Sequence, residues 1–201
     1  MPAGFTDYEK KKIKAGLIEQ GRKMFSIYGL KKTTINDITG VLGIAQGSFY
    51  KFYSSKEELY FEILELEGEK IRKNMAKNTE LVKANPEEAI KKILLETFLE
   101  LGENRLFQDI FSGNSYDILI RKLPEERLKE HTKSDFAEII PLIRKWQDEG
   151  ILKDVKPEAI TGLLHVLFFV SLHKKEIDEV FDDTFELLVD LIVNGLIKEK
   201  S

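Results

Sequence analysis

The stretch TTINDITGVLGIAQGSFYKFYSSKEEL, from Thr33 to Leu59, decides the fold of this chain. Thr34 and Asp37 have the spacing of a capping box, in which side chains satisfy the free amides of a helix's first turn. Apolar residues then recur on one face for about two turns, namely Ile35, Ile38, Val41 and Leu42. The sequence therefore predicts a short helix that begins at Thr34.

A second short helix is predicted after Gly43, which stands where a left-handed helix terminator belongs. The segment covers residues 45–51, and after the turn Ile44 and Phe49 can point inward. The residues left on the outer face are Gln46, Gly47, Ser48, Tyr50 and Lys51. Two short helices, a tight turn and an exposed polar face are the layout of a helix-turn-helix that reads DNA.

The outer face carries chemistry that suits a duplex groove. Gln46 can pair with the donor and acceptor of an adenine edge, Ser48 can bond to bases or phosphate, and Gly47 permits close approach. Tyr50 and Lys51 suit phosphate oxygens. The next helix starts at Ser55, which has capping-box spacing to Glu58, so its amide-rich end can face a phosphate beside Lys56.

The stretch resembles the DNA-binding domain of the tetracycline-repressor (TetR) family. The shared features are a threonine pair, an Asp-Ile run, a glycine turn, a G-x-x-Y recognition helix and an S-K-E-E-L run, here Thr33-Thr34, Asp37-Ile38, Gly43, Gly47 to Tyr50 and Ser55 to Leu59. Phe25 and Gly29 also stand at the family's usual distance upstream. The alternative is a helical hairpin of an unrelated bundle, with Tyr50, Phe52 and Tyr53 as core aromatics.

The resemblance implies phosphate contacts from Thr34, Tyr50, Lys51 and Lys56, and base or groove contacts from Gln46, Gly47 and Ser48. Two positions depart from the family pattern. Phe52 stands where relatives often have His or a phosphate-binding Tyr, and Tyr53 stands where a buried Phe is usual. Gly21 replaces a common Ala, which costs about 1 kcal/mol in helix propensity unless close helix packing needs the missing methyl.

Charge is divided unevenly along the chain. Residues 1–56 hold nine Lys and one Arg against two Asp and two Glu, a net charge of +6, and the remainder carries −10, for −4 in total. The positive charge coincides with the motif, as a DNA-binding domain requires. Near the amino end, Lys10, Lys11, Lys12 and Lys14 could reach flanking DNA backbone or form a solvated face.

Composition bounds the remaining classes. The 201 residues are 42% hydrophobic and 33% charged, and none is Cys, which excludes disulfides, thiolate zinc sites and a cysteine nucleophile. The first residues lack a signal-peptide core, and the most apolar run, residues 159–172, is too short to span a bilayer. We expect a soluble, cytoplasmic protein with no membrane partner.

The fold class predicted for the whole chain is all-α, with an N-terminal helix-turn-helix domain over residues 1–54 and a helical effector-binding and dimerisation domain over residues 55–201. Breaks at residues 85–86, 112–114, 123–124, 150 and 156–157 separate the helices. The expected helices cover 6–28, 34–42, 45–51, 55–78, 86–102, 105–111, 116–122, 124–147, 157–173 and 183–198.

Two late helices are apolar on nearly every side, beyond the needs of one buried stripe. We interpret them as a homodimer interface, an arrangement the family resemblance also implies, with contacts from Leu163, Leu167, Phe168, Leu188, Leu191, Ile192 and Gly195. An intramolecular core would explain the same apolarity. A dimer has a functional reason, because two recognition helices related by a dyad read both halves of a palindrome.

The family resemblance further implies a small-molecule effector pocket, although aromatic residues at helical spacing can equally form plain core. The candidate lining residues are Phe107, Phe111, Tyr116, Phe136, Trp146 and His165. Buried carboxylates of this acidic region would pair with a cationic apolar ligand, although surface Asp and Glu account for most of its charge. His165, on an apolar helix, is interpreted as a core residue.

Other classes of function find no pattern here. No HExxH or paired-ligand spacing joins the three His residues, so no metal or other cofactor is expected. The chain also lacks G-x-S-x-G, Walker and G-x-G-x-x-G motifs, so an enzyme is not expected. The main hypothesis is a homodimeric, ligand-responsive repressor that binds a palindromic DNA operator. The alternatives are a DNA-binding regulator without an effector and a small-molecule-binding protein that has lost DNA binding.

Overall fold

The computed structural model describes residues 5–77, 79–112, 115–127 and 139–198. These residues are mostly helical, which confirms the predicted all-α class, and an isolated antiparallel bridge joins Leu152 to Ile197. The chain forms two compact units. The first comprises residues 1–67 and 105–125, and the second comprises residues 68–104 and 126–201.

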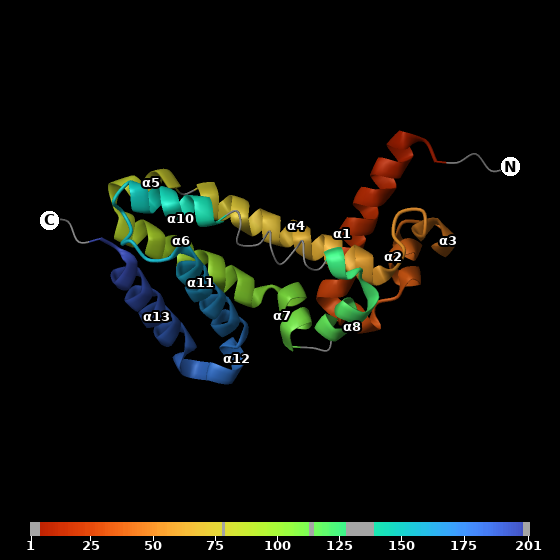
Figure 1. Cartoon of the computed structure of the whole chain (residues 1–201). Coiled ribbons are helices and arrows are strands. Elements are labelled where there is room, and N and C mark those ends of the chain that lie inside the picture. Colours follow the sequence, from red (N-terminus) through yellow and green to blue (C-terminus); the bar gives the residue numbers. More distant parts are fainter. Residues whose placement is uncertain (1–4, 78, 113–114, 128–138, 199–201) are drawn as a thin grey trace. The chain divides into compact units, whose positions relative to one another are not determined.

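The first unit is assembled from two separate stretches of sequence (Figure 1). Its helices are α1 (Asp7–Lys32), α2 (Ile35–Val41), α3 (Gln46–Phe49), the start of α4 (Lys56–Lys77), α7 (Arg105–Ser112) and α8 (Ser115–Lys122). α7 packs against α1, although more than seventy residues separate them. The predicted domain boundary at residues 54 and 55 falls inside this unit.

Apolar side chains from α1 and α4 fill the core of the first unit. The ring of Phe25 meets that of Tyr60 edge to face, with centroids 5.0 Å apart, and both are buried. A methyl group on Gly21 would lie 3.0 Å from side-chain carbons of Leu59 and Ile63. Close packing of α1 on α4 therefore accounts for glycine at this position.

The second unit contains α5 (Thr79–Ala84), α6 (Pro86–Glu103), α10 (Ile139–Asp148), α11 (Pro157–Leu172), α12 (Lys174–Ile177), η1 (Asp178–Val180) and α13 (Phe181–Leu196). Both α11 and α13 pack on α6 and on each other. Gly102 lets α6 approach α11, because a Cβ there would collide with the backbone carbonyl of Ser171. The Lys91 ammonium joins α6 to α13 through Asp190 at 2.8 Å and Glu186 at 3.0 Å.

Several predicted helix bounds differ from the structure. α3 is shorter than residues 45–51, because after Phe49 the chain turns and the N–H of Tyr53 bonds to the Phe49 carbonyl at 3.1 Å. The short helices α5, α12 and η1 were not predicted, since none is long enough to show a periodic apolar face. The helix predicted over 124–147 lies partly outside the described residues.

Candidate functional site

The first helix of the predicted motif begins as its spacing indicates. The Thr34 hydroxyl accepts a hydrogen bond from the Asp37 N–H at 3.2 Å, and the Asp37 carboxylate accepts from the Thr34 N–H at 2.8 Å and hydroxyl at 2.7 Å. The hydrogen bonds from the Thr34 hydroxyl and N–H hold the pKa of Asp37 below its usual value, and the nearby Lys56 charge adds to this. The start of α2 is thus fixed locally.

The turn between α2 and α3 depends on Gly43, whose φ of 64° is left-handed. The N–H of Gly43 bonds to the Gly40 carbonyl at 3.1 Å, and that of Ile44 bonds to the Thr39 carbonyl at 3.2 Å. These bonds close the end of α2, so that α3 starts in a new direction at Gln46. The helix-turn-helix geometry predicted from the sequence is confirmed.

The structure brings the predicted DNA-reading side chains together on α3 and the turn after it. Phe49 is fully buried and anchors this short helix, and Ser48 is half-buried. The exposed residues are Gln46, Gly47, Tyr50 and Lys51. A Cβ on Gly47 would meet open space, so nothing in the described chain covers that point of the helix. The face is therefore available to a groove.

Phe5, near the amino end of the chain, contacts the last residues of this surface. The Phe5 ring lies 6.4 Å from that of Phe52, and the Lys51 ammonium lies 4.8 Å from the Phe5 centroid, within cation–π range. Phe52 thus packs in the position where relatives often carry a phosphate-binding group. Tyr53, at 3% exposure, occupies the buried position that the family pattern assigns to Phe.

Lys56 has a structural role that the motif spacing did not reveal. Its ammonium donates to the carbonyls of Leu30 and Thr33, each at 2.7 Å, and to that of Lys31 at 3.3 Å. Cations are favourable at the carbonyl end of a helix, here α1. The phosphate contact inferred for Lys56 stays a prediction, now beside an observed role in holding α4 to the end of α1.

The end of α1 is held from a second direction by Asp109 of α7. One oxygen of its carboxylate accepts from the Leu30 N–H at 3.1 Å, the Tyr60 hydroxyl at 3.1 Å and the Ser115 hydroxyl at 2.9 Å. Burial of Tyr60, with the negative charge of Asp109, raises the pKa of its hydroxyl far above the usual range. Sequence reasoning missed Asp109, whose only local sign is a carboxylate inside an apolar helix.

The lysines at the start of α1 are exposed, but two of them are paired. Lys10 bonds to Asp7 at 3.1 Å, and Lys14 bonds to Glu62 of α4 at 2.9 Å. Lys11 and Lys12 are exposed. Lys14 therefore helps to hold α1 on α4 while its side chain stays 48% exposed, and a contact of these lysines with DNA stays a prediction.

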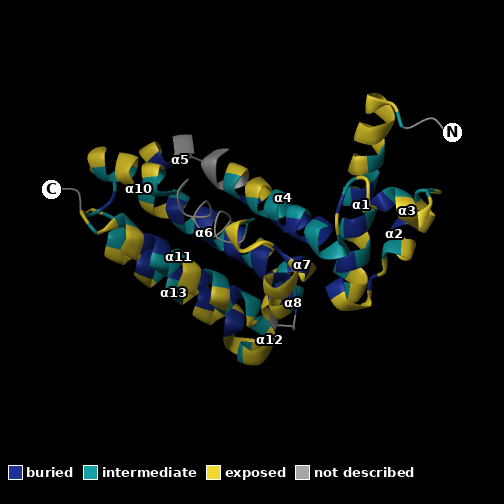
Figure 2. Cartoon of the chain, turned by 45° about the vertical axis from the view of Figure 1, so that its right-hand side comes forward, coloured by how far each residue is buried: buried dark blue, intermediate teal, exposed yellow. Residues whose placement is uncertain are grey.

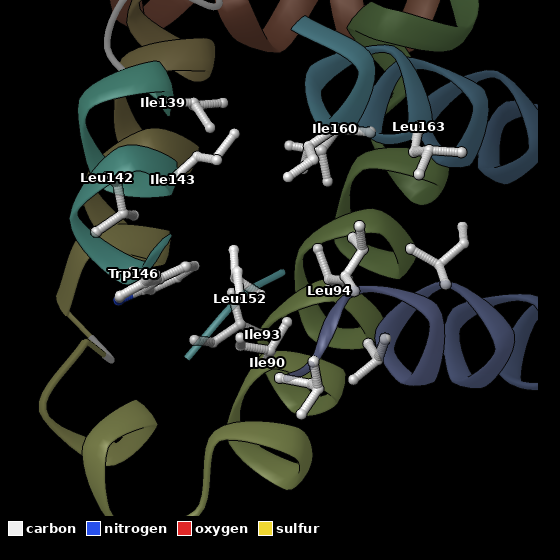
Figure 3. A pocket seen from close by; sticks show the side chains of 15 residues that line it. Ile90, Ile93, Leu94, Ile139, Leu142, Ile143, Trp146, Leu152, Ile160 and Leu163 are labelled. Carbon is white, nitrogen blue, oxygen red and sulfur yellow. The ribbon is translucent and has the colours of Figure 1, made fainter. Parts of the chain in front are cut away.

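An apolar pocket of about 60 Å³ lies in the second unit, among α6, α10, α11 and α13 (Figure 3). One of the six predicted lining residues, Trp146, lines this pocket. The other residues of the pocket are Ile90, Ile93, Leu94, Ile139, Leu142, Ile143, Leu152, Ile160, Leu163, Leu164, Ile192, Val193, Leu196 and Ile197. No carboxylate lines it, so this pocket gives no support to the expectation of a site for cationic ligands.

The other candidate lining residues lie elsewhere. Phe107, Phe111 and Tyr116 belong to the first unit, where Phe111 and Tyr116 stack with centroids 6.4 Å apart and are exposed. His165 is exposed on α11, so its interpretation as a core residue is wrong. Because α11 is apolar on most sides, its sequence pattern does not show which side is buried. Phe136 lies outside the described residues.

The predicted dimer residues divide into two groups. Leu167 and Ile192 are buried in the core of their own unit, and Leu163 lines the pocket, so these three serve the intramolecular packing left open as the alternative. Leu191 and Gly195 are exposed, and Phe168 and Leu188 are half-buried. Figure 2 shows exposed positions along both α11 and α13. Val166, Phe169 and Leu187 are further exposed apolar residues of these two helices.

Two further features of the described chain are relevant to function. Over these residues, His, Asp and Glu side chains nowhere gather in a group that could bind a metal ion. None of the described helices has the length and apolarity needed to cross a membrane.

Comparison with known proteins matches the site to one family. The family model described as bacterial regulatory proteins, tetR family, matches residues 17–63. The chain is 23% identical over 180 residues to the uncharacterized HTH-type transcriptional regulator YvaF of Bacillus subtilis, covering 81% of this chain and 85% of YvaF. It is 44% identical over 48 residues to the HTH-type transcriptional repressor KstR2 of Mycobacterium tuberculosis, covering 24% of each chain.

Solved structures share the fold over nearly the whole chain. A TetR-family transcriptional regulator from Pectobacterium atrosepticum superposes with a TM-score of 0.71 at 17% identity, covering 98% of this chain and all of its own. SmeT in complex with triclosan superposes with a TM-score of 0.62 at 16% identity, covering 94% of this chain and 93% of SmeT.

Proposed function

Because the chain belongs to the tetR family of bacterial regulatory proteins, we propose that this DNA-binding transcriptional regulator is a repressor that binds a palindromic operator as a homodimer and is released by a small molecule. The observation that carries the DNA-binding part is the exposed face of α3. Gln46, Gly47, Tyr50 and Lys51 lie outward there, on a helix anchored by the fully buried Phe49.

The roles within this surface follow from side-chain chemistry. Gln46 reads a base edge, and Ser48 contacts a base or a phosphate. Tyr50 and Lys51 bind phosphate, with Thr34 at the start of α2. The net charge of +6 over residues 1–56 supplies the sequence-independent attraction that any such complex needs.

The homodimer is proposed from the exposed apolar face of α11 and α13. Leu187 and Leu191 are 59% and 63% exposed, and Val166 and Phe169 are nearly half-exposed. Burying such a face against a second copy would remove it from water and place two recognition helices about a dyad. Operator half-site spacing then reports the dimer geometry.

Ligand response is supported by two observations. The second unit holds an apolar pocket, and the similarly folded SmeT has been solved with triclosan. A ligand that binds one arrangement of the helices better than another shifts the population between them. Repression is favoured by the local similarity to the repressor KstR2, and a cytoplasmic location follows from the role.

The deciding experiment is selection of bound duplexes from random DNA, followed by gel shifts with the selected sequence. We expect an inverted repeat. Gln46→Ala should relax the preference at particular positions by about 1–3 kcal/mol, with Glu19→Ala, exposed on α1, as the control. Recovery of no preferred sequence, or a uniform loss of affinity with Gln46→Ala, would contradict the assignment.

A further inference from the structure

The pocket of the second unit is lined by apolar side chains. Fourteen of its fifteen residues are Leu, Ile or Val, and the remaining one is Trp146 (Figure 3). No side chain that can be charged lines it, although one third of the chain's residues are charged. A charged group placed there would lose its hydration without gaining a partner.

Several charged side chains on or next to the same helices are paired with one another. On α6 and α13, Lys91 bonds to Glu186 and Asp190. These hydrogen bonds raise the pKa of Lys91 above its usual value. Glu149, just after α10, pairs with Lys83 at 3.2 Å. None of these groups lines the pocket.

The size of the pocket limits its occupant further. Its volume is about 60 Å³, whereas drug-sized ligand pockets hold ~300–1,000 Å³ and a dry apolar cavity of ~150 Å³ admits one benzene. A group of a few carbon atoms is therefore the largest that enters before the surrounding helices separate.

We propose that this pocket binds the short hydrocarbon end of an uncharged molecule, and that such a molecule is the effector. The role of this molecule as the effector rests on the proposed ligand response. α11 and α13 form two walls of the pocket and also carry the exposed apolar face of Val166, Phe169, Leu187 and Leu191. A molecule that separates these walls acts on the surface assigned to the dimer.

Trp146 makes the pocket directly observable, because it is the only Trp in the chain. We would titrate the full-length protein with 1-hexanol, hexanoate and hexylammonium, which share one chain and differ in charge, while following Trp emission. We expect a saturable change with 1-hexanol and affinities at least about tenfold weaker for both ions. Equal responses to the alcohol and the ions, or no saturable response to the alcohol, would overturn the proposal.

A filled pocket provides the second test. Ile143→Phe adds bulk to the α10 wall, where Ile143 is 3% exposed, and Ile120→Phe makes the same change at an exposed site of α8. Affinity for 1-hexanol should fall about tenfold in the first variant and stay unchanged in the second. Equal affinities in both would contradict the assignment. Should Ile143→Phe fail to fold by circular dichroism, Leu163→Phe on the α11 wall replaces it.

Gel shifts with 1-hexanol separate this inference from the proposed function. Saturation of the Trp146 signal without any change in operator affinity would keep the site but remove the effector role. Release of DNA by 1-hexanol without a Trp146 signal would keep ligand response and refute this pocket.

Discussion

The carboxylate of Asp109 accepts a hydrogen bond from the backbone N–H of Leu30 at 3.1 Å, across 79 positions of sequence. Leu30 lies three residues before Thr33, whose hydroxyl donates to the Gly29 carbonyl at 2.8 Å, and Thr34 then starts α2. The start of the helix-turn-helix is therefore tied to α7. In the proposed regulator, this hydrogen bond links α7, which follows α6 in the chain, directly to the DNA-binding helices.

Asp109→Asn tests how much these hydrogen bonds contribute. The amide keeps one oxygen but loses the negative charge that the Leu30, Tyr60 and Ser115 donors share, so we expect the free energy of unfolding to fall by about 1–3 kcal/mol. Operator affinity should fall as well. Chemical denaturation and gel shifts measure the two effects, with Asp117→Asn, exposed on α8, as the matched control. An unchanged stability would show that the bond contributes nothing net.

Gly29→Ala addresses the same junction from the other side. Gly29 has a φ of 74°, and an added Cβ would lie 2.6 Å from an Asp109 oxygen. We expect the free energy of unfolding to fall by more than about 1–2 kcal/mol, which is the cost of left-handed backbone for an L-residue. The fall should exceed this cost because Asp109 must also move away from the added methyl group. Gly40→Ala, in α2 with open space around it, should be neutral or stabilising in the same denaturation series.

Lys51 and Lys56 are expected to differ in the salt dependence of DNA binding. Lys51→Ala should lower the slope of log affinity against log salt by about 1, because an exposed phosphate contact is lost. Lys56→Ala should lower the free energy of unfolding by about 1–3 kcal/mol, because three carbonyls lose their donor. A drop in salt slope with Lys56→Ala would establish the phosphate contact predicted for it as well.

Leu191→Glu should convert the proposed dimer to a monomer. Leu191 is 63% exposed within its own chain, so the substitution leaves the monomer core intact but puts a charge in the proposed interface. Sedimentation should report half the mass, and operator binding should weaken strongly because one half-site is lost. Ile120→Glu, 47% exposed on α8, is the control. A dimeric Leu191→Glu protein would place the interface elsewhere.

The start of α2 should weaken in acid. Hydrogen bonds from Thr34 lower the pKa of Asp37, so its contribution to stability is present above the unfolded-state pKa of about 3.9 and is lost as the pH falls through the lower folded value. Asp37→Asn should therefore destabilise the protein at pH 7 more than at pH 3. Denaturant titrations at both values measure this. An equal difference at both would show that the carboxylate charge is irrelevant to the cap.

The sequence predicts those parts of the site that depend on neighbours in the chain. The Thr34 cap, the Gly43 turn and the outward face of α3 follow from spacings of a few residues, and the structure confirms their geometry. Asp109 and Lys56 could not be assigned in this way, because their partners lie far along the chain. Their hydrogen bonds exist only once the helices have packed.

The pocket and the proposed dimer face could not be predicted from the sequence for a different reason. α11 is apolar on most sides, so periodicity cannot separate the buried Leu167 from the exposed Val166 beside it. The aromatic residues drew attention to a lining that is aliphatic except for Trp146. Which side of such a helix faces a neighbour is decided by tertiary packing.

The divided sequence of the first unit sets an order on how the protein is made. Residues 105–125 complete the unit that residues 1–67 begin, so α6 is synthesised before the last part of this unit. Until then Tyr60 lacks the Leu106 carbonyl and the Asp109 carboxylate that its hydroxyl meets in the finished fold. A fragment that ends at Glu67 would lack α7. The surface of α1 that α7 covers would then be exposed to water and to other nascent chains.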